Sequence, residues 1–301
     1  MDFGRGVALD AIDFRLPPDP PGTRALLAGV RGRGRSHDLR VGSPRWADRG
    51  YVGSLYPEGT TPGGYLNAYA RALPTVELNA TWYRCDAEQN RRWAAQVPPG
   101  FRFCPKLPGT ISHQKRLRSG DADRDAFLEA VAAFGDSLGV CWLLLPNDFG
   151  PREWPALRTF VESWPAEIPF AVELRHTEWF ADPAVRQEVF ALLRQSGAIA
   201  VITDVAGRRD VLHMELTAPT AFVRLALNDL DPTDYDRTGA WADRLADWFE
   251  AGLHTAHLFV HQPTEHNNVE LARHAVQTFN LRTHAGLPVP PKHSAVQGRL
   301  F

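Results

Sequence analysis

Eight short apolar runs alternate with amphipathic stretches from Asp38 onward. Each run has the length of a β-strand, and most are followed by a polar loop and then by apolar residues at helical spacing, as at Phe127, Val131 and Phe134. The predicted strands are 39–42, 75–78, 101–105, 140–145, 170–174, 198–203, 222–227 and 256–260. The predicted helices are 64–72, 87–96, 124–138, 155–164, 183–196, 241–251 and 269–279; only 205–220 lacks a clear helix.

Alternating strands and helices form a parallel sheet with right-handed crossovers. Eight such units favour closure into one (β/α)8 TIM barrel, and a chain of 301 residues is long enough for that fold. An open doubly wound sheet is the alternative. We expect 1–37 to be an irregular extension that is partly disordered, 38–281 to be the barrel, and 282–301 to be a linker and flexible C-terminal tail, because both ends are rich in Pro or Gly.

The composition is that of an ordinary globular protein, with 44% hydrophobic and 23% charged residues and a net charge of −2. No apolar run approaches the ~20 residues of a membrane helix, and the first residues lack the pattern of a signal peptide. The cysteines, Cys85, Cys104 and Cys141, form no CxxC pair. We therefore expect buried thiols, a cytoplasmic location and no membrane partner.

In a TIM barrel the working residues lie where strands end and the following loops begin. The predicted strand ends carry an unusually polar and aromatic set of side chains. Four of them are candidates for proton transfer or for holding one divalent metal ion: Glu77, Glu173, His176 and Asp204. Eight more are candidates for binding substrate: Asn79, Trp82, Tyr83, Lys106, His113, Arg175, Trp179 and Arg224.

Each of these candidates also has a structural interpretation. Glu77 and Glu173 could form internal ion pairs with Arg175 or Arg224, because a buried charge is costly unless it is paired. The stretch 106–118 contains no acidic residue, which suits an anionic ligand but is also typical of a solvated loop. The aromatic residues could pack a loop or provide a platform for a ring. No Gly-rich phosphate loop occurs, so no nucleotide cofactor is indicated, and no HExxH motif occurs, so zincin chemistry lacks support.

The chain resembles the YecE-like family (domain of unknown function 72) over roughly 41–280. The resemblance implies a TIM barrel, implies no generally assigned reaction, and favours Glu77, Asn79, Tyr83, Lys106, His113, Glu173, Arg175, Trp179 and Arg224 as functional positions. The motifs that carry it are Tyr56-Pro57, Thr75-Val76-Glu77-Leu78-Asn79, Thr81-Trp82-Tyr83, Phe101-Arg102-Phe103, Lys106, Ile111-Ser112-His113, Leu144-Leu145-Pro146, Ala171-Val172-Glu173-Leu174-Arg175-His176, Trp179 and Val223-Arg224-Leu225.

The chain ends in Gln297-Gly298-Arg299-Leu300-Phe301 after a Pro-rich segment. This ending is similar to the Gln-x-x-Leu-Phe peptides with which bacterial replication and repair proteins bind the sliding clamp. Leu300 and Phe301 would be the apolar anchors in such a complex, and Gln297 would fix the orientation by hydrogen bonding. The alternatives are that the tail folds back onto the barrel or that the match is fortuitous.

Three functions follow from these features. The first is a phosphodiesterase- or hydrolase-type enzyme that acts on a phosphate-containing substrate in DNA repair or processing and is recruited by the sliding clamp. The second is a metal-independent hydrolase, lyase or isomerase of a small anionic metabolite. The third is a non-catalytic nucleic-acid-binding adaptor. The sequence favours the first because cationic and aromatic side chains suit phosphates and bases.

Overall fold

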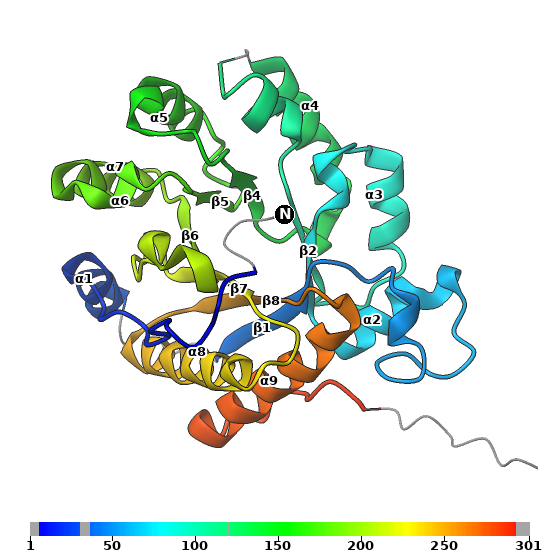
Figure 1. Ribbon diagram of the computed structural model, residues 1–301. Helices are drawn as coiled ribbons and strands as arrows, with labels where there is room; N and C mark the ends of the chain where they lie inside the picture. The colour runs from blue at the N-terminus through cyan, green and yellow to red at the C-terminus, as the bar shows by residue number, and fades with distance from the viewer. Residues whose placement is uncertain (1–5, 31–36, 119–120, 293–301) are drawn as a thin grey trace, which may run out of the picture.

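The structure, a computed structural model, describes residues 6–30, 37–118 and 121–292. Eight parallel strands form one sheet in the order β3-β2-β1-β8-β7-β6-β5-β4 and curve around a common axis (Figure 1). The strands are β1 (Asp38–Ser43), β2 (Thr75–Leu78), β3 (Arg102–Pro105), β4 (Cys141–Leu144), β5 (Phe170–Glu173), β6 (Ile199–Val205), β7 (Thr220–Ala226) and β8 (Thr255–His261). All eight predicted strands are confirmed.

The barrel closes between β3 and β4 through a few contacts rather than a full ladder. The Gly139 amide donates to the Phe103 carbonyl at 2.7 Å, and the Leu107 amide donates to the Trp142 carbonyl at 2.9 Å. Each bond joins a residue within one of these strands to a residue that flanks the other, with isolated bridges at Phe103–Leu138 and Lys106–Trp142. The fold is therefore a TIM barrel, as predicted, and the open doubly wound sheet is excluded.

Two apolar layers follow from the alternation of side chains along the strands. The inner layer fills the barrel and includes Trp142, Leu144, Val201, Phe222 and Phe259. The outer layer lies between strands and helices and is much larger. The helices of the outer ring are α2 (Tyr65–Ala72), α3 (Ala87–Ala94), α4 (Asp121–Ala132), α5 (Trp154–Glu162), α6 (Glu178–Ala181), α7 (Pro183–Gln195), α8 (Pro232–Ala251) and α9 (Asn268–Thr283).

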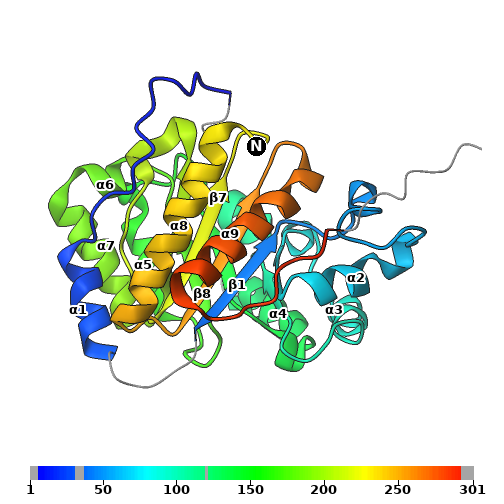
Figure 2. The same cartoon turned by 90° about the horizontal axis from the view of Figure 1, so that it is seen from below.

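The N-terminal extension differs from the prediction, because part of it is the helix α1 (Pro21–Val30). After β6 the chain forms only a short 3-10 segment, Ala206–Val211, so that crossover supplies no α-helix. The helix α1 lies at this place, between α7 and α8 (Figures 1 and 2). The Thr23 hydroxyl donates to the Met214 carbonyl and accepts from the Leu216 amide, both at 2.7 Å. The extension thus completes the helical ring where the barrel unit leaves a gap.

In the C-terminal segment, the helix α9 continues to Thr283, two residues into the predicted linker. The described residues after it form no helix or strand and contact α9. The Arg273 guanidinium donates to the carbonyls of Pro290 and Pro291, at 3.0 and 2.7 Å. The clamp-like residues Gln297, Leu300 and Phe301 lie outside the described residues. Among those described, no helix has the length and apolar character needed to cross a membrane.

The dependence of the barrel on α1 is testable at Thr23, whose side chain is fully buried. We expect Thr23→Val to lower the free energy of unfolding by ~1–3 kcal/mol, because it leaves a buried carbonyl and a buried amide without their partner. The matched control is Thr23→Ser, which keeps the hydroxyl and should lower the free energy of unfolding by clearly less than Thr23→Val does. Urea denaturation of the full chain measures both, and equal losses in the two variants would contradict the role assigned to these bonds.

Candidate functional site

A cavity of about 820 Å³ opens at the carboxyl ends of the strands. This volume lies in the usual range for sites that bind small molecules. Eight of the twelve residues predicted to act on or bind a substrate line it: Glu77, Asn79, Trp82, Tyr83, Lys106, His113, Arg175 and Arg224. The rule that strand ends carry the site therefore placed most of the predicted residues at one cavity.

The floor of the cavity is organised by Arg224 on β7. Its guanidinium donates to both carboxylate oxygens of Glu77, at 2.8 and 3.1 Å, and to one oxygen of Glu173 at 2.8 Å. The other oxygen of Glu173 accepts from Arg175 Nε at 2.7 Å. The four side chains are almost wholly buried. Because burying a charge is costly unless it is paired, this alternation of two arginines and two carboxylates is what permits charge at the barrel mouth.

Glu77 has two further partners, Asn79 at 3.0 Å and His261 at 2.9 Å. Burial alone would raise the pKa of Glu77, but the charges of Arg224 and His261 outweigh it and hold that pKa well below its ordinary value. Burial likewise opposes ionisation of Glu173, yet Arg175 and Arg224 keep its pKa lowered. The carboxylates of Glu77 and Glu173 are therefore ionised and accept hydrogen bonds from the arginines, so they can hold the arginines in place.

Lys106 directly follows β3, where the barrel closes. Its ammonium nitrogen lies over the ring of Trp82, 4.1 Å from the ring centre, and 5.0 Å from that of Trp142. Burial, reinforced by the charge of Arg224, lowers the pKa of Lys106 to about 7, although Glu77 and Glu173 oppose this shift. A lysine that is partly neutral near pH 7 is unusual and marks a candidate functional group.

Trp82 and His113 form the wall beside Lys106. Their rings meet edge to face, with centres 4.5 Å apart. His113 lies in a π-helical turn, Thr110–Gln114, a form of helix that is frequent at functional sites. A Cβ at Gly109 would approach the Trp82 ring to 2.7 Å, so the close contact requires glycine there. Partial burial and the charges of Lys106 and Arg175 lower the pKa of His113 to about 4, so its imidazole is neutral at pH 7.

The cations of the loop after His113 do not face an anion site. Lys115 pairs with Asp123 at 2.5 Å, Arg116 pairs with Asp148 and Glu153, and Arg118 pairs with Glu153. The absence of acids within 106–118 was therefore misleading, because acids from later segments neutralise these side chains. Only Lys106 and His113 of this stretch line the cavity.

Four predicted residues lie outside the cavity lining. Glu173 is fully buried behind the two arginines. His176 packs on Gly150, and Trp179 is fully buried and donates to the Phe149 carbonyl at 2.7 Å. Trp179 is thus not placed to stack on a ligand, and both His176 and Trp179 contact the loop after β4.

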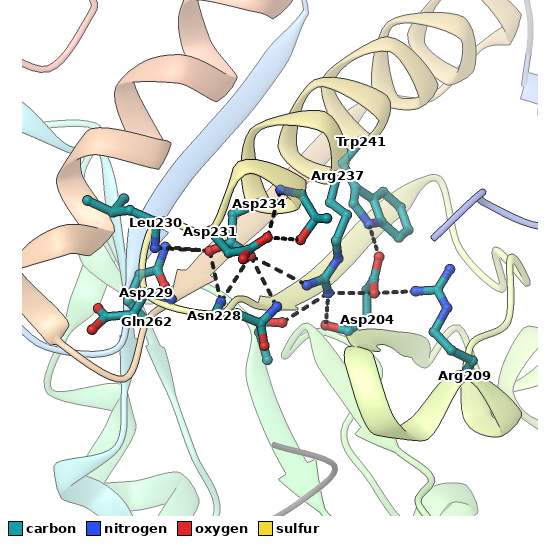
Figure 3. A network of polar contacts seen from close by, with 12 residues as sticks. Asp204, Arg209, Asn228, Asp229, Leu230, Asp231, Asp234, Arg237, Trp241 and Gln262 are labelled. Carbon is teal, nitrogen blue, oxygen red and sulfur yellow. Dashed lines mark hydrogen bonds and ion pairs between the residues drawn. The ribbon is translucent and has the colours of Figure 1, made fainter. Parts of the chain in front are cut away.

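Asp204, the fourth of these residues, belongs to a separate buried network (Figure 3). Its carboxylate accepts from Arg209 at 2.5 Å, from Arg237 at 2.7 Å and from Trp241 at 2.8 Å. Side chains alternate along β6, so Thr203 lines the cavity and Asp204 faces the outer layer. Asp204 ties β6 to α8 rather than contributing to the cavity.

The loop after β7 is held in a strained form beside the cavity. Asp229 and Leu230 both have left-handed backbone, with φ of 66° and 68°. The Asp234 carboxylate accepts from the amides of Asn228 and Leu230, at 2.8 and 3.1 Å, and Gln262 accepts from the Asp229 amide at 2.6 Å (Figure 3). Strain of this kind persists where surrounding contacts enforce it, often next to functional sites. Gln262 itself lines the cavity, so this network fixes one part of the rim.

The four residues predicted to hold one metal ion do not meet at one point. They are Glu77, Glu173, His176 and Asp204, and among the described residues no three His, Cys, Asp or Glu side chains are placed to hold a metal.

Trp142 belongs to the site but was not predicted. Its ring lies under both Lys106 and Arg224. The sequence signal that could have identified it is a large aromatic residue two positions before the inward-facing Leu144 on the same strand.

The closed parallel barrel with a polar cavity at its carboxyl end defines a TIM-barrel protein. The chain belongs to the family described as "Protein of unknown function DUF72", whose sequence model matches residues 40–295. It is 35% identical to the UPF0759 protein YecE of Escherichia coli K12 over 244 residues, which cover 75% of this chain and 86% of that protein. It is 28% identical to the UPF0759 protein YunF of Bacillus subtilis 168 over 174 residues, 55% of this chain and 60% of that protein.

A solved structure of a DUF72 family protein from Enterococcus faecalis V583 has the same fold. The two structures agree with a TM-score of 0.64 over 82% of this chain and 99% of that chain, at 18% sequence identity. At this identity the likeness shows the fold alone.

The role of Arg224 predicts a pH-dependent loss of stability. The paired carboxylates contribute stability that is present above their unfolded pKa and is lost as pH falls through their lowered folded pKa. Arg224→Met leaves both carboxylates under-compensated, so their folded pKa values rise. We expect a loss of ~3–5 kcal/mol in unfolding free energy at pH 7 and a much smaller loss at pH 4, where protonation removes the unpaired charge.

Urea denaturation at the two pH values measures this effect. The matched control is Arg45→Met, which removes an arginine at the same cavity whose side chain is 54% exposed and paired with Glu265. That change should lower the free energy of unfolding by less than ~1 kcal/mol, because the pair is exposed to solvent. Equal losses for Arg224→Met at pH 7 and pH 4 would contradict the account.

Proposed function

We propose that this chain is an enzyme that binds a small carboxylate- or phosphate-bearing molecule in the barrel cavity and acts on it by proton transfer. The observation that carries the proposal is the set of cations around one cavity: Lys106, Arg175 and Arg224 line it, while the carboxylates beside them are already paired.

The hydrogen-bonding character of the cavity supports an anionic ligand. All four carboxylate oxygens of Glu77 and Glu173 accept hydrogen bonds from neighbouring side chains. The Lys106 amine, which borders the cavity, has no hydrogen bond or ion pair with any part of the chain that the structure describes. A ligand with acceptor oxygens would gain charge-assisted hydrogen bonds there, which are stronger than neutral ones.

Lys106 and His113 are the groups in the cavity best suited to proton transfer. A catalytic acid or base works best when its pKa lies near the working pH. The Lys106 amine, with a pKa of about 7, meets this condition, and the neutral His113 imidazole lies on the same wall. In this proposal Glu77 and Glu173, with their lowered pKa values, hold the arginines rather than move protons.

A phosphate-containing substrate in DNA repair or processing is the second candidate. The supporting observation is Tyr83, which is 87% exposed beside Trp82 at the cavity rim and could stack on a splayed base. The cavity volume of about 820 Å³ suits one nucleotide rather than a duplex segment. Recruitment by the sliding clamp through Gln297, Leu300 and Phe301 stays a prediction from the sequence.

Anion binding is tested by the thermal stability of the full chain in sulfate and in pyruvate, neither of which titrates between pH 6 and pH 8. A ligand that binds only the folded state raises the melting temperature. We expect both anions to stabilise the protein, with affinity about tenfold higher at pH 6, where Lys106 is charged, than at pH 8.

Two variants give this test its control. Arg175→Met should lose most of the anion effect, whereas Lys115→Met, which removes a lysine paired with Asp123 outside the cavity, should keep it. Stabilisation that is equal in both variants, or absent from the native protein, would refute the small-anion proposal. Stabilisation by single-stranded oligonucleotides that is lost in Tyr83→Ala, without any by small anions, would favour the DNA candidate.

A further inference from the structure

The amine of Lys106 lies where its charged form is poorly stabilised. The side chain is 2% exposed, and its nitrogen contacts two tryptophan rings instead of a carboxylate. The residue is anchored through its backbone, because the Lys106 amide donates to the Leu78 carbonyl at 3.0 Å and the Lys106 carbonyl accepts from the Thr81 hydroxyl at 2.8 Å. The amine is thus held at a fixed place on the cavity wall.

The charged and titratable groups around this amine come from several strands and from the loop after β3. Arg224 and Arg175 disfavour its protonation, and Glu77 and Glu173 favour it, but burial is the largest influence. Both carboxylates are tied to arginines, and neither has an ion pair with Lys106 within the described chain. A lysine that is desolvated beside other cations is a form of activated nucleophile. The groups concerned are Glu77, His113, Glu173, Arg175, Arg224 and His261.

We propose that Lys106 is a nucleophile that forms an imine with an aldehyde or ketone that also carries a carboxylate or phosphate. This inference rests on the proposed function, because the substrate would bind in the same cavity and belong to the same class of anions. The inference adds that the substrate carries a carbonyl group and that the imine forms at Lys106 Nζ.

The step balances without any oxidant or reductant. The neutral amine attacks the carbonyl carbon, an N–C bond forms, and the carbonyl π electrons move to oxygen, which takes up a proton. The nitrogen then transfers a proton to solvent, the hydroxyl is protonated and leaves as water, and a C=N bond forms. The net change is amine plus carbonyl plus one proton giving a protonated imine plus water.

The surroundings of the amine suit both partners of this reaction. Burial opposes a cationic imine as it opposes the ammonium, but the tryptophan faces and the carboxylates of Glu77 and Glu173 attract positive charge and offset part of that cost without forming a bond to the nitrogen. Arg175 and Arg224 line the same cavity and are cationic partners for the anionic group of the substrate. An imine formed there withdraws electrons from the neighbouring carbon, and His113 on the same wall is then the group left for the proposed proton transfer.

The chain offers an internal control, since it has only three lysines, Lys106, Lys115 and Lys292. The full native chain is incubated at pH 7 with pyruvate or with uncharged acetone in the presence of cyanoborohydride, which reduces an imine to a stable secondary amine. Peptide mass mapping then gives the rate of labelling at each lysine. We expect pyruvate to label Lys106 about 100-fold faster than Lys115 or Lys292, because the Lys106 amine, with its pKa lowered to about 7, is partly neutral at this pH and therefore nucleophilic.

The anionic part of the substrate class is tested in the same experiment. Pyruvate should label Lys106 faster than acetone does, and sulfate should slow labelling by pyruvate at that site alone. Lys106→Met should lose the label without loss of fold, because it replaces a desolvated amine by an apolar side chain.

Labelling of Lys106 no faster than that of Lys115 and Lys292 would overturn the inference; if sulfate still stabilised the native chain, the proposed anion site would stand. Equal labelling of Lys106 by pyruvate and acetone would overturn the assignment of an anionic carbonyl substrate. Because the comparison among lysines uses the native protein, it holds even if a variant fails to fold.

Discussion

The ion pairs of Arg224 hold the mouth of the barrel together. Arg224 lies on β7 and reaches Glu77 on β2 and Glu173 on β5, strands that are not its neighbours in the sheet. A side chain that bonds across the axis in this way fixes strands whose own ladders do not meet. Removing any one of the three would leave buried charge uncompensated, so the arrangement constrains which side chains this end of the barrel can carry. The apolar layer beneath, including Trp142 and Phe222, keeps water away from these groups and strengthens their interaction.

The lack of a charged partner for the Lys106 amine follows from these ion pairs. The carboxylates that could have neutralised it are engaged by Arg224 and Arg175, and its nitrogen lies against Trp82 and Trp142 instead. A barrel interior built only for stability would place an apolar residue there, since an unpaired amine costs free energy when it is buried. A buried, unpaired Lys106 amine lowers the stability of the fold, and its presence is therefore the strongest sign that the cavity has a chemical role.

The sequence predicted the strands and eight of the residues that line the cavity because both depend on local patterns. Short apolar runs fix the strands, and a parallel barrel brings all their carboxyl ends to one face, which places Glu77, Lys106 and Arg224 together. Alternation along a strand shows that neighbours such as Thr203 and Asp204 lie on opposite sides, but the sequence could not show which of them faces inward. The structure places Thr203 in the cavity and Asp204 outside it. The burial of Trp179 depends on a contact with Phe149, thirty residues away in the sequence. The helix α1 was missed because its partner is the segment around Met214, nearly two hundred residues later.

The role proposed for Lys106 is tested most directly by the titration of its amine. Because the chain has three lysines, NMR of lysine-labelled protein gives three side-chain titration curves, and the Lys106→Met variant assigns one of them. The structure predicts that the Lys106 signal titrates at about pH 7. Lys115, paired with Asp123 at the surface, and Lys292 give the other two curves and serve as internal references. A Lys106 curve that falls near the ordinary lysine pKa of about 10.4 would contradict the electrostatic arrangement described for the cavity, and with it the role proposed for Lys106.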